Sequence, residues 1–218
     1  MYDITPDKTK ALFFAKRQLV ELVYDAVNLE GINYTIPEVQ TLLDGVTIGG
    51  HRLSDQTITL NQAAAWKYLF AAIENDSFEL SKQFTCKLHN IAAKDEALQW
   101  GVFRNGSVTI AGTAYRPPIH DTLENLWQEM LQKADNITDI YHKAIFVFLQ
   151  MARNQFFYDV NKRMGRFMMN GILLHTGYPA INLPAKKQLE FNTLMLEFYS
   201  SNDCTEMTAF MMSCLEQH

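Results

Sequence analysis

The chain has 218 residues, of which 48% are hydrophobic and 20% charged, and its formal net charge is −5. This length is sufficient for one sizeable core, while the acidic balance argues against a broad nucleic-acid-binding surface. No apolar run is long enough to predict a membrane-spanning helix, and residues 1–6 do not predict a secretory signal. Cys86, Cys204 and Cys214 show no metal-binding spacing, so we expect free thiols in a reducing cytoplasm.

The first half of the chain predicts a succession of helices. Apolar residues recur at helical spacing from about residue 8, and Gly31 follows this pattern as a stop signal. Thr35 to Glu38, with Pro37 at an early position, is typical of a helix start. In chain order, helices are expected over about 8–29, 35–44, 54–73 and 78–91.

Residues 101–110 interrupt the helical pattern. Two short strand-like runs flank Asn105-Gly106, a dipeptide that supplies the positive φ angles of a tight turn, so the sequence predicts a β-hairpin. Gly112 and Pro117-Pro118 end it. Two interpretations are open: a lid over the core, or an edge that binds an extended peptide by strand addition.

Helices resume after the hairpin and continue to the end of the chain. The helix over about 138–153 is apolar nearly all round, so we expect it at the centre of the fold. The prediction is an all-α bundle with one β-hairpin, in a single domain. The expected helices of this half cover about 119–134, 138–153, a segment ending near Leu174, 186–201 and 204–216.

A loop that leads into a helix at residues 154–166 carries the candidate site. Arg163 and Arg166 are three residues apart, so both guanidinium groups lie on one helix face. Helix starts attract anions, and Asn161 and Lys162 add polar groups to the first turn. The carboxylate of Asp159 could hold a divalent cation against phosphates. From the residues alone, this is a polyphosphate-binding segment.

The same segment resembles the signature of the Fic (fido) family, His-Pro-Phe-x-Asp/Glu-Gly-Asn-Gly/Lys-Arg-x-x-Arg. Gln155 stands at the position of the family's catalytic histidine, Phe156 at that of the proline, and Val160 at that of the glycine. The residues that match in register are Phe157, Asp159, Asn161, Lys162, Arg163 and Arg166.

The resemblance covers about residues 20–200 and implies a Fic-type helical bundle. It implies one Fic-like domain over residues 1–218, with N-terminal helices to about residue 60 and a Fic core over about 61–218. The predicted hairpin resembles the Fic flap, at 101–115, where Val108, Thr109 and Ile110 would position a segment of a target protein. The sequence specifies neither that target nor the oligomeric state, and an oligomer is compatible with it.

The family reaction transfers AMP from ATP to a target hydroxyl, with Mg²⁺ bridging the phosphates. The resemblance assigns the metal, through Mg-ATP, to Asp159 and the phosphates to the four polar or basic residues of 161–166. Gln155 cannot take up a proton, and loss of a general base reduces rates by about 10² to 10⁴. We therefore expect a weak or inactive adenylyltransferase or, alternatively, a non-catalytic nucleotide- or protein-binding module. His142 and His175, on neighbouring predicted helices, are the other candidates for the base.

Two further questions stay open from the sequence. Asn161-Lys162-Arg163 also resembles the Doc branch of the family, which transfers phosphate instead of AMP. Glu30, followed by Gly31, resembles the glutamate of the family's inhibitory helix, which would contact Arg166. A rival match, with the same spacing, places Glu197 four residues after Thr193.

Overall fold

The computed structural model describes residues 4–215, and within this range every regular element is helical. The predicted all-α class is thereby confirmed, while residues 1–3 and 216–218 of the predicted domain lie outside the described part. No helix between residues 4 and 215 combines the length and apolar character needed to cross a bilayer. The helices are α1 (Lys8–Arg17), α2 (Leu19–Leu29), α3 (Ile36–Leu43), α4 (Leu53–Glu74), α5 (Lys82–Ala92), η1 (His120–Thr122), α6 (Leu123–Asp135), α7 (Ile140–Asn154), α8 (Asn161–His175), η2 (Ala185–Lys187), α9 (Gln188–Ser201) and α10 (Thr205–Ser213).

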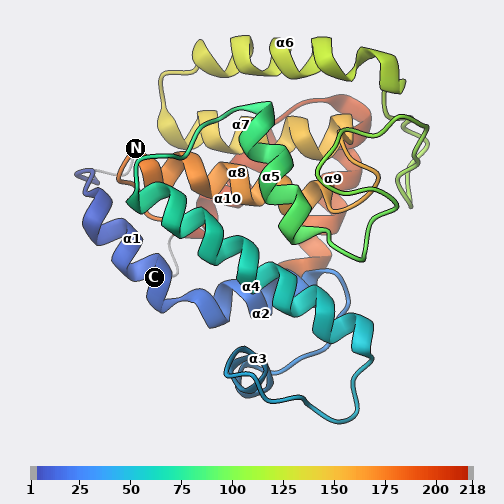
Figure 1. Cartoon of the computed structure of the whole chain (residues 1–218). Helices are drawn as coiled ribbons and strands as arrows, with labels where there is room; N and C mark the ends of the chain where they lie inside the picture. Colours follow the sequence, from blue (N-terminus) through green and yellow to red (C-terminus); the bar gives the residue numbers. More distant parts are fainter. Residues whose placement is uncertain (1–3, 216–218) are drawn as a thin grey trace.

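The helices α7 and α8 pack along each other at the centre of the molecule (Figure 1). On one side α6 covers α7, and α4 and α5 pack against α8. The small helix α3 packs against α2 and α4 and lies at the opposite end from α6 (Figure 1). The loop between α7 and α8, residues 155–160, is short, so it brings the end of one central helix next to the start of the other.

The central position of α8 follows from its composition. Nearly all its residues are buried, including the basic Arg163 and Arg166, as expected for a helix that packs on every side. Gly165 permits the closest approach, because a Cβ atom at this position would lie 2.7 Å from the backbone oxygen of Phe148 in α7. The packing of the two central helices therefore depends on this glycine.

Side-chain caps mark some of the helix starts. The helix start predicted at Thr35 is confirmed, and there Thr35 and Glu38 form a capping box, while Ser81 caps α5. The single helix expected over 8–29 is instead two, because the chain turns at Gln18. The break lets α1 pack against α4 and α8 while α2 packs against α3 and α4.

The prediction of a β-hairpin over residues 101–110 is wrong, since no strand occurs between residues 4 and 215. Neither Asn105 nor Gly106 has the positive φ that the predicted turn requires; positive φ angles occur instead at Gly101 and Gly112. An isolated two-stranded ribbon is marginally stable in water. Here the segment's polar groups find other partners, and residues 101–118 form an irregular loop.

Arg104 holds this loop in place. Its side chain is almost fully buried, and its backbone N–H donates to the oxygen of Phe156 at 2.9 Å. The guanidinium group donates to the carbonyl oxygens of Gln155 at 2.5 Å, Gly106 at 2.7 Å and Pro118 at 2.6 Å. One side chain thus joins both ends of the loop to the end of α7.

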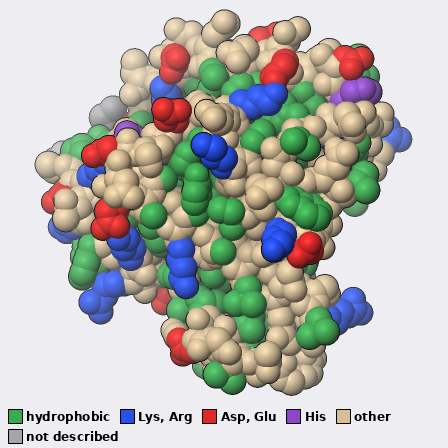
Figure 2. Space-filling view, viewed as in Figure 1, with side chains coloured by type: hydrophobic (Ala, Val, Ile, Leu, Met, Phe, Trp, Pro, Cys, Tyr) green, Lys and Arg blue, Asp and Glu red, His purple; other side chains and the backbone are tan. Residues whose placement is uncertain are grey.

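The surface carries mixed charge. On the face drawn in Figure 2, lysine and arginine side chains are interspersed with acidic and apolar ones. This pattern agrees with the acidic overall balance.

We expect Gly165→Ala to lower the free energy of unfolding by about 1–3 kcal/mol, because the added methyl group collides with backbone that cannot move aside easily. Thermal and urea unfolding measure the change. Gly49→Ala is the matched control, since a Cβ atom there meets nothing within 4 Å and its φ is not positive. Equal stability of the two variants would contradict this account of the α7–α8 contact.

Candidate functional site

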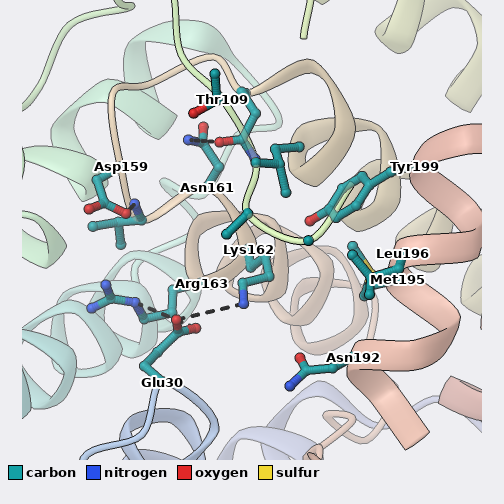
Figure 3. Close-up of a pocket in the computed structure, with 15 residues that line it drawn as sticks. Glu30, Thr109, Asp159, Asn161, Lys162, Arg163, Asn192, Met195, Leu196 and Tyr199 are labelled. Carbon is teal, nitrogen blue, oxygen red and sulfur yellow. Dashed lines mark hydrogen bonds and ion pairs between the residues drawn. The ribbon is translucent and has the colours of Figure 1, made fainter. Parts of the chain in front are cut away.

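A cavity of about 530 Å³ opens at the start of α8 (Figure 3). Its walls come from the end of α2, the 109–112 part of the loop, the 155–160 loop with the first turn of α8, and one face of α9. The lining residues are Glu30, Thr109, Ile110, Ala111, Gly112, Gln155, Asp159, Val160, Asn161, Lys162, Arg163, Asn192, Met195, Leu196 and Tyr199.

The 155–160 loop has two residues in the left-handed region of backbone space. Gln155 ends α7 with φ of 51°, and Val160 precedes α8 with φ of 65°. A β-branched residue is disfavoured in this conformation, which glycine adopts freely. Asn161 stabilises the turn, since its side chain accepts from the Phe157 N–H at 2.9 Å and donates to the Phe157 oxygen at 2.8 Å.

The amide of Gln155 lies at the cavity and has two protein partners. Its oxygen accepts from Asn161 Nδ2 at 3.0 Å, and its nitrogen donates to the backbone oxygen of Ala152 at 2.6 Å. The side chain is therefore held by hydrogen bonds at both ends of the amide.

Asp159 is exposed, and one carboxylate oxygen accepts from the N–H of Val160 at 2.7 Å. Its backbone oxygen lies 3.3 Å from Nε2 of His89, a residue that the sequence analysis missed. His89 stacks on Phe157 with ring centroids 3.8 Å apart, and its Nδ1 accepts from the Gly101 N–H at 3.0 Å. Burial lowers the pKa of His89 to about 4, so the neutral ring carries its proton on Nε2 and donates to Asp159.

Three basic residues follow in the first two turns of α8. Lys162 is half-buried, whereas the side chains of Arg163 and Arg166 are buried. No side chain caps the start of α8, and its first three residues, Asn161, Lys162 and Arg163, line the cavity. The helix start therefore combines uncapped N–H groups with three cations.

Arg166 lies deeper than the other two and does not line the main cavity. It faces a space of about 20 Å³, also lined by Ala26 and Gln62, and its NH2 atom has no hydrogen-bond partner among the described residues. Burial lowers the pKa of Arg166 to about 10, while Glu30 opposes this shift. The group stays charged near neutral pH.

Glu30 lies among the three cations, and Figure 3 shows it beside Lys162 and Arg163. Its carboxylate oxygens are 3.7 Å from Lys162 Nζ, 4.0 Å from Arg163 Nε and 3.6 Å from Arg166 NH2. Burial alone would raise the pKa of Glu30, but the three cations outweigh it and hold the pKa below its ordinary value. The carboxylate is thus ionised in the position that an anionic ligand of these cations would take.

The end of α2 fixes the position of Glu30. Gly31, with φ of 84°, closes the helix in the left-handed conformation that glycine adopts readily. Gln188, at the start of α9, donates to the backbone oxygens of Asn28 and Leu29 at 3.1 and 3.0 Å. The last turn of α2 is therefore bound to α9.

Glu96 is a further carboxylate in contact with Arg163, and the sequence analysis did not predict it. It lies in the turn after α5 and forms a two-pronged ion pair with Arg163, in which NH1 donates to Oε2 at 2.9 Å and NH2 donates to Oε1. A lone glutamate far from the 154–166 segment has no motif that would reveal such a contact.

The other predicted residues lie as follows. Thr109 and Ile110 line the cavity and Val108 does not. Glu197 and Thr193 are exposed on α9, outside the lining, whereas Glu30 is inside it. Neither His142, which contacts Asp139 at the start of α7, nor His175, beside Phe78, is among the lining residues.

Comparisons with known proteins agree with this arrangement. The family described as Fic/DOC matches residues 79–173. Proteins named protein adenylyltransferase Fic are similar, for example those of Drosophila erecta and Drosophila persimilis, each 22% identical over 97% of this chain. The chain spans only 43% and 42% of these two relatives.

Solved structures share the fold. A Fic domain containing signaling protein from Bacteroides thetaiotaomicron superposes with a TM-score of 0.78 and 19% identity, covering 98% of this chain and 87% of that one. Fic-1 from C. elegans superposes with a TM-score of 0.76 and 16% identity, covering 94% of this chain and 68% of that one. The comparisons therefore show a Fic/DOC family domain over residues 79–173, within a chain that shares the fold of these Fic structures over nearly its whole length.

Proposed function

We propose that the cavity binds Mg-ATP and that the chain is a weak or inactive protein adenylyltransferase whose phosphate site is closed by Glu30. One observation carries this proposal. Lys162, Arg163 and the uncapped start of α8 line the same cavity, and the carboxylate of Glu30 already lies among the cations. The names of the relatives support the reaction class.

The residues present fit a polyphosphate. Arginine and lysine donors and helix-start N–H groups are the common partners of phosphate oxygens in proteins. Arg166 supports the fit independently, because its NH2 atom is buried, charged and without a hydrogen bond among the described residues. Lys162, Arg163 and Arg166 would hold the phosphates after Glu30 has moved.

Asp159 fits the role of a metal ligand through Mg-ATP. Its carboxylate is exposed at the cavity, and only one of its oxygens has an internal partner. Magnesium ions in proteins are often held by one carboxylate together with phosphates and waters. When bound, Mg-ATP would supply the adenylyl group and part of the neutralising charge.

A protein target would reach the cavity beside residues 108–110. Thr109 and Ile110 line the same cavity as the start of α8, so a hydroxyl side chain held there would lie near the phosphate site. Gln155 stands at the position of the family's catalytic histidine. It cannot act as the general base, because a carboxamide accepts hydrogen bonds but does not take up a proton near neutral pH.

The alternative is a module that binds the nucleotide, or a protein, without turnover. The hydrogen bonds of Gln155 favour it, because both ends of the amide already have partners in Asn161 and Ala152. These two bonds fix the orientation of the amide, so it cannot turn freely toward a target hydroxyl.

We expect Glu30→Gln to tighten Mg-ATP binding about tenfold or more, which corresponds to about 1.4 kcal/mol, because it removes a negative charge from the phosphate site. Isothermal titration calorimetry measures the affinity. Glu197→Gln is the matched control, with the same chemical change outside the cavity, and we expect no effect. A gain in the control alone would transfer the inhibitory role to Glu197, and no binding by either variant would contradict the nucleotide site.

Arg163→Ala in the Glu30→Gln background should weaken Mg-ATP binding at least tenfold, because a charged hydrogen-bond donor to phosphate contributes about 1.5–3 kcal/mol. The same calorimetric titration measures it. Arg153→Ala, on α7 and outside the cavity lining, is the control. An unchanged affinity would show that the nucleotide phosphates do not use the start of α8.

Gln155→His in the Glu30→Gln background should increase labelling of a protein target about 10²-fold or more, because it restores a proton acceptor. ATP labelled at the α or the γ phosphate, incubated with the variant and cell lysate, distinguishes AMP transfer from phosphate transfer. Gln150→His, on the same helix outside the cavity, is the control. If Glu30→Gln alone labels equally fast, Gln155 is not a defect.

A further inference from the structure

Arg163 contacts two carboxylates in different ways. With Glu96 it makes a two-pronged pair through NH1 and NH2, and with Glu30 it makes one contact of 4.0 Å through Nε. The first is a pair of hydrogen bonds, whereas the second is longer than a hydrogen bond. The two carboxylates also lie on different edges of the guanidinium group.

Only one of the two carboxylates belongs to the cavity. Glu30 and Arg163 line it, and Glu96 does not. A group that closes a site must occupy it, so the position of Glu96 behind Arg163 does not fit a second inhibitor. This position instead fits a residue that holds the guanidinium group of Arg163 from the side away from the cavity.

The turn that carries Glu96 is anchored. The N–H groups of Glu96 and Ala97 both donate to the oxygen of Ala93 at 3.1 Å, and Ala93 is fully buried. From α4, Asn61 donates to the backbone oxygen of Lys94 at 2.7 Å. The carboxylate therefore projects from a segment joined to the core, with only 16% of its side chain exposed.

We propose that Glu96 is a positioning residue, which fixes the NH1 and NH2 groups of Arg163 and thereby presents the Nε edge to a phosphate in the cavity. This inference rests on the nucleotide site proposed above. A guanidinium group that is already oriented loses less conformational freedom when it binds phosphate. In this proposal, the affinity gained in this way exceeds the affinity lost through the negative charge of Glu96.

Calorimetric titrations of Mg-ATP and of adenosine, all in the Glu30→Gln background, test the proposal. We expect Glu96→Gln to weaken Mg-ATP binding about tenfold and to leave adenosine binding unchanged, because adenosine has no phosphate. Glu129→Gln, which removes an exposed carboxylate paired with Lys133, is the matched control and should change neither affinity. A merely structural role would weaken both ligands together and would overturn the proposal.

Tighter Mg-ATP binding by Glu96→Gln would also overturn it, since Glu96 would then act as a second inhibitory charge. If Glu30→Gln itself binds no Mg-ATP, the proposed nucleotide site is wrong, and the role of Glu96 is not what failed.

Where Glu96→Gln does not fold, Glu96→Asp keeps the charge, and its shorter side chain should give the same selective loss for Mg-ATP. In the Arg163→Lys background, substitution of Glu96 should have no further effect on Mg-ATP binding; an added loss there would contradict action through Arg163.

Discussion

The placement of positive charge at the start of α8 is the constraint on which the site depends. Helix α8 is buried on nearly all sides, and it carries the three cations Lys162, Arg163 and Arg166. Burial of a cation costs free energy unless the cation is paired with an opposite charge. Glu30 from α2 and Glu96 from the turn after α5 supply the opposite charge. The start of α8, the end of α2 and the turn after α5 therefore pack together so that their opposite charges compensate one another.

The two glutamates differ in how tightly the surrounding structure holds them. Glu96 bonds directly to Arg163 and projects from a turn anchored to the core. The carboxylate of Glu30 makes longer contacts with the cations, of 3.6 to 4.0 Å, and Glu30 follows the last residue of α2. A ligand that competes for the cations would therefore displace Glu30 first. The difference separates a permanent counter-charge from an exchangeable one.

Sequence reasoning located the helices and the polar segment well, because hydrophobic periodicity and capping residues act over a few positions. The helix start predicted at Thr35 to Glu38 is confirmed as the start of α3, and residues 159–163 line one cavity. Sequence reasoning failed where contacts between residues far apart in the chain determine the local structure. Asn105-Gly106 is a hairpin signal by itself, yet Arg104 draws this segment to the end of α7 instead. The contact of Glu96 with Arg163 spans 67 residues and leaves no local pattern.

The clamp made by Arg104 has a consequence for local opening. Its guanidinium group donates to the carbonyl oxygens of Gly106 and Pro118 in the 101–118 loop and to those of Asn154 and Gln155 at the end of α7. None of these segments can therefore be released without leaving a buried cation short of acceptors. The loop and the turn that carries Gln155 and Asp159 should therefore open as one cooperative unit. A protease or exchanging solvent that reaches one of them would reach both, and the site would lose its order in a single step.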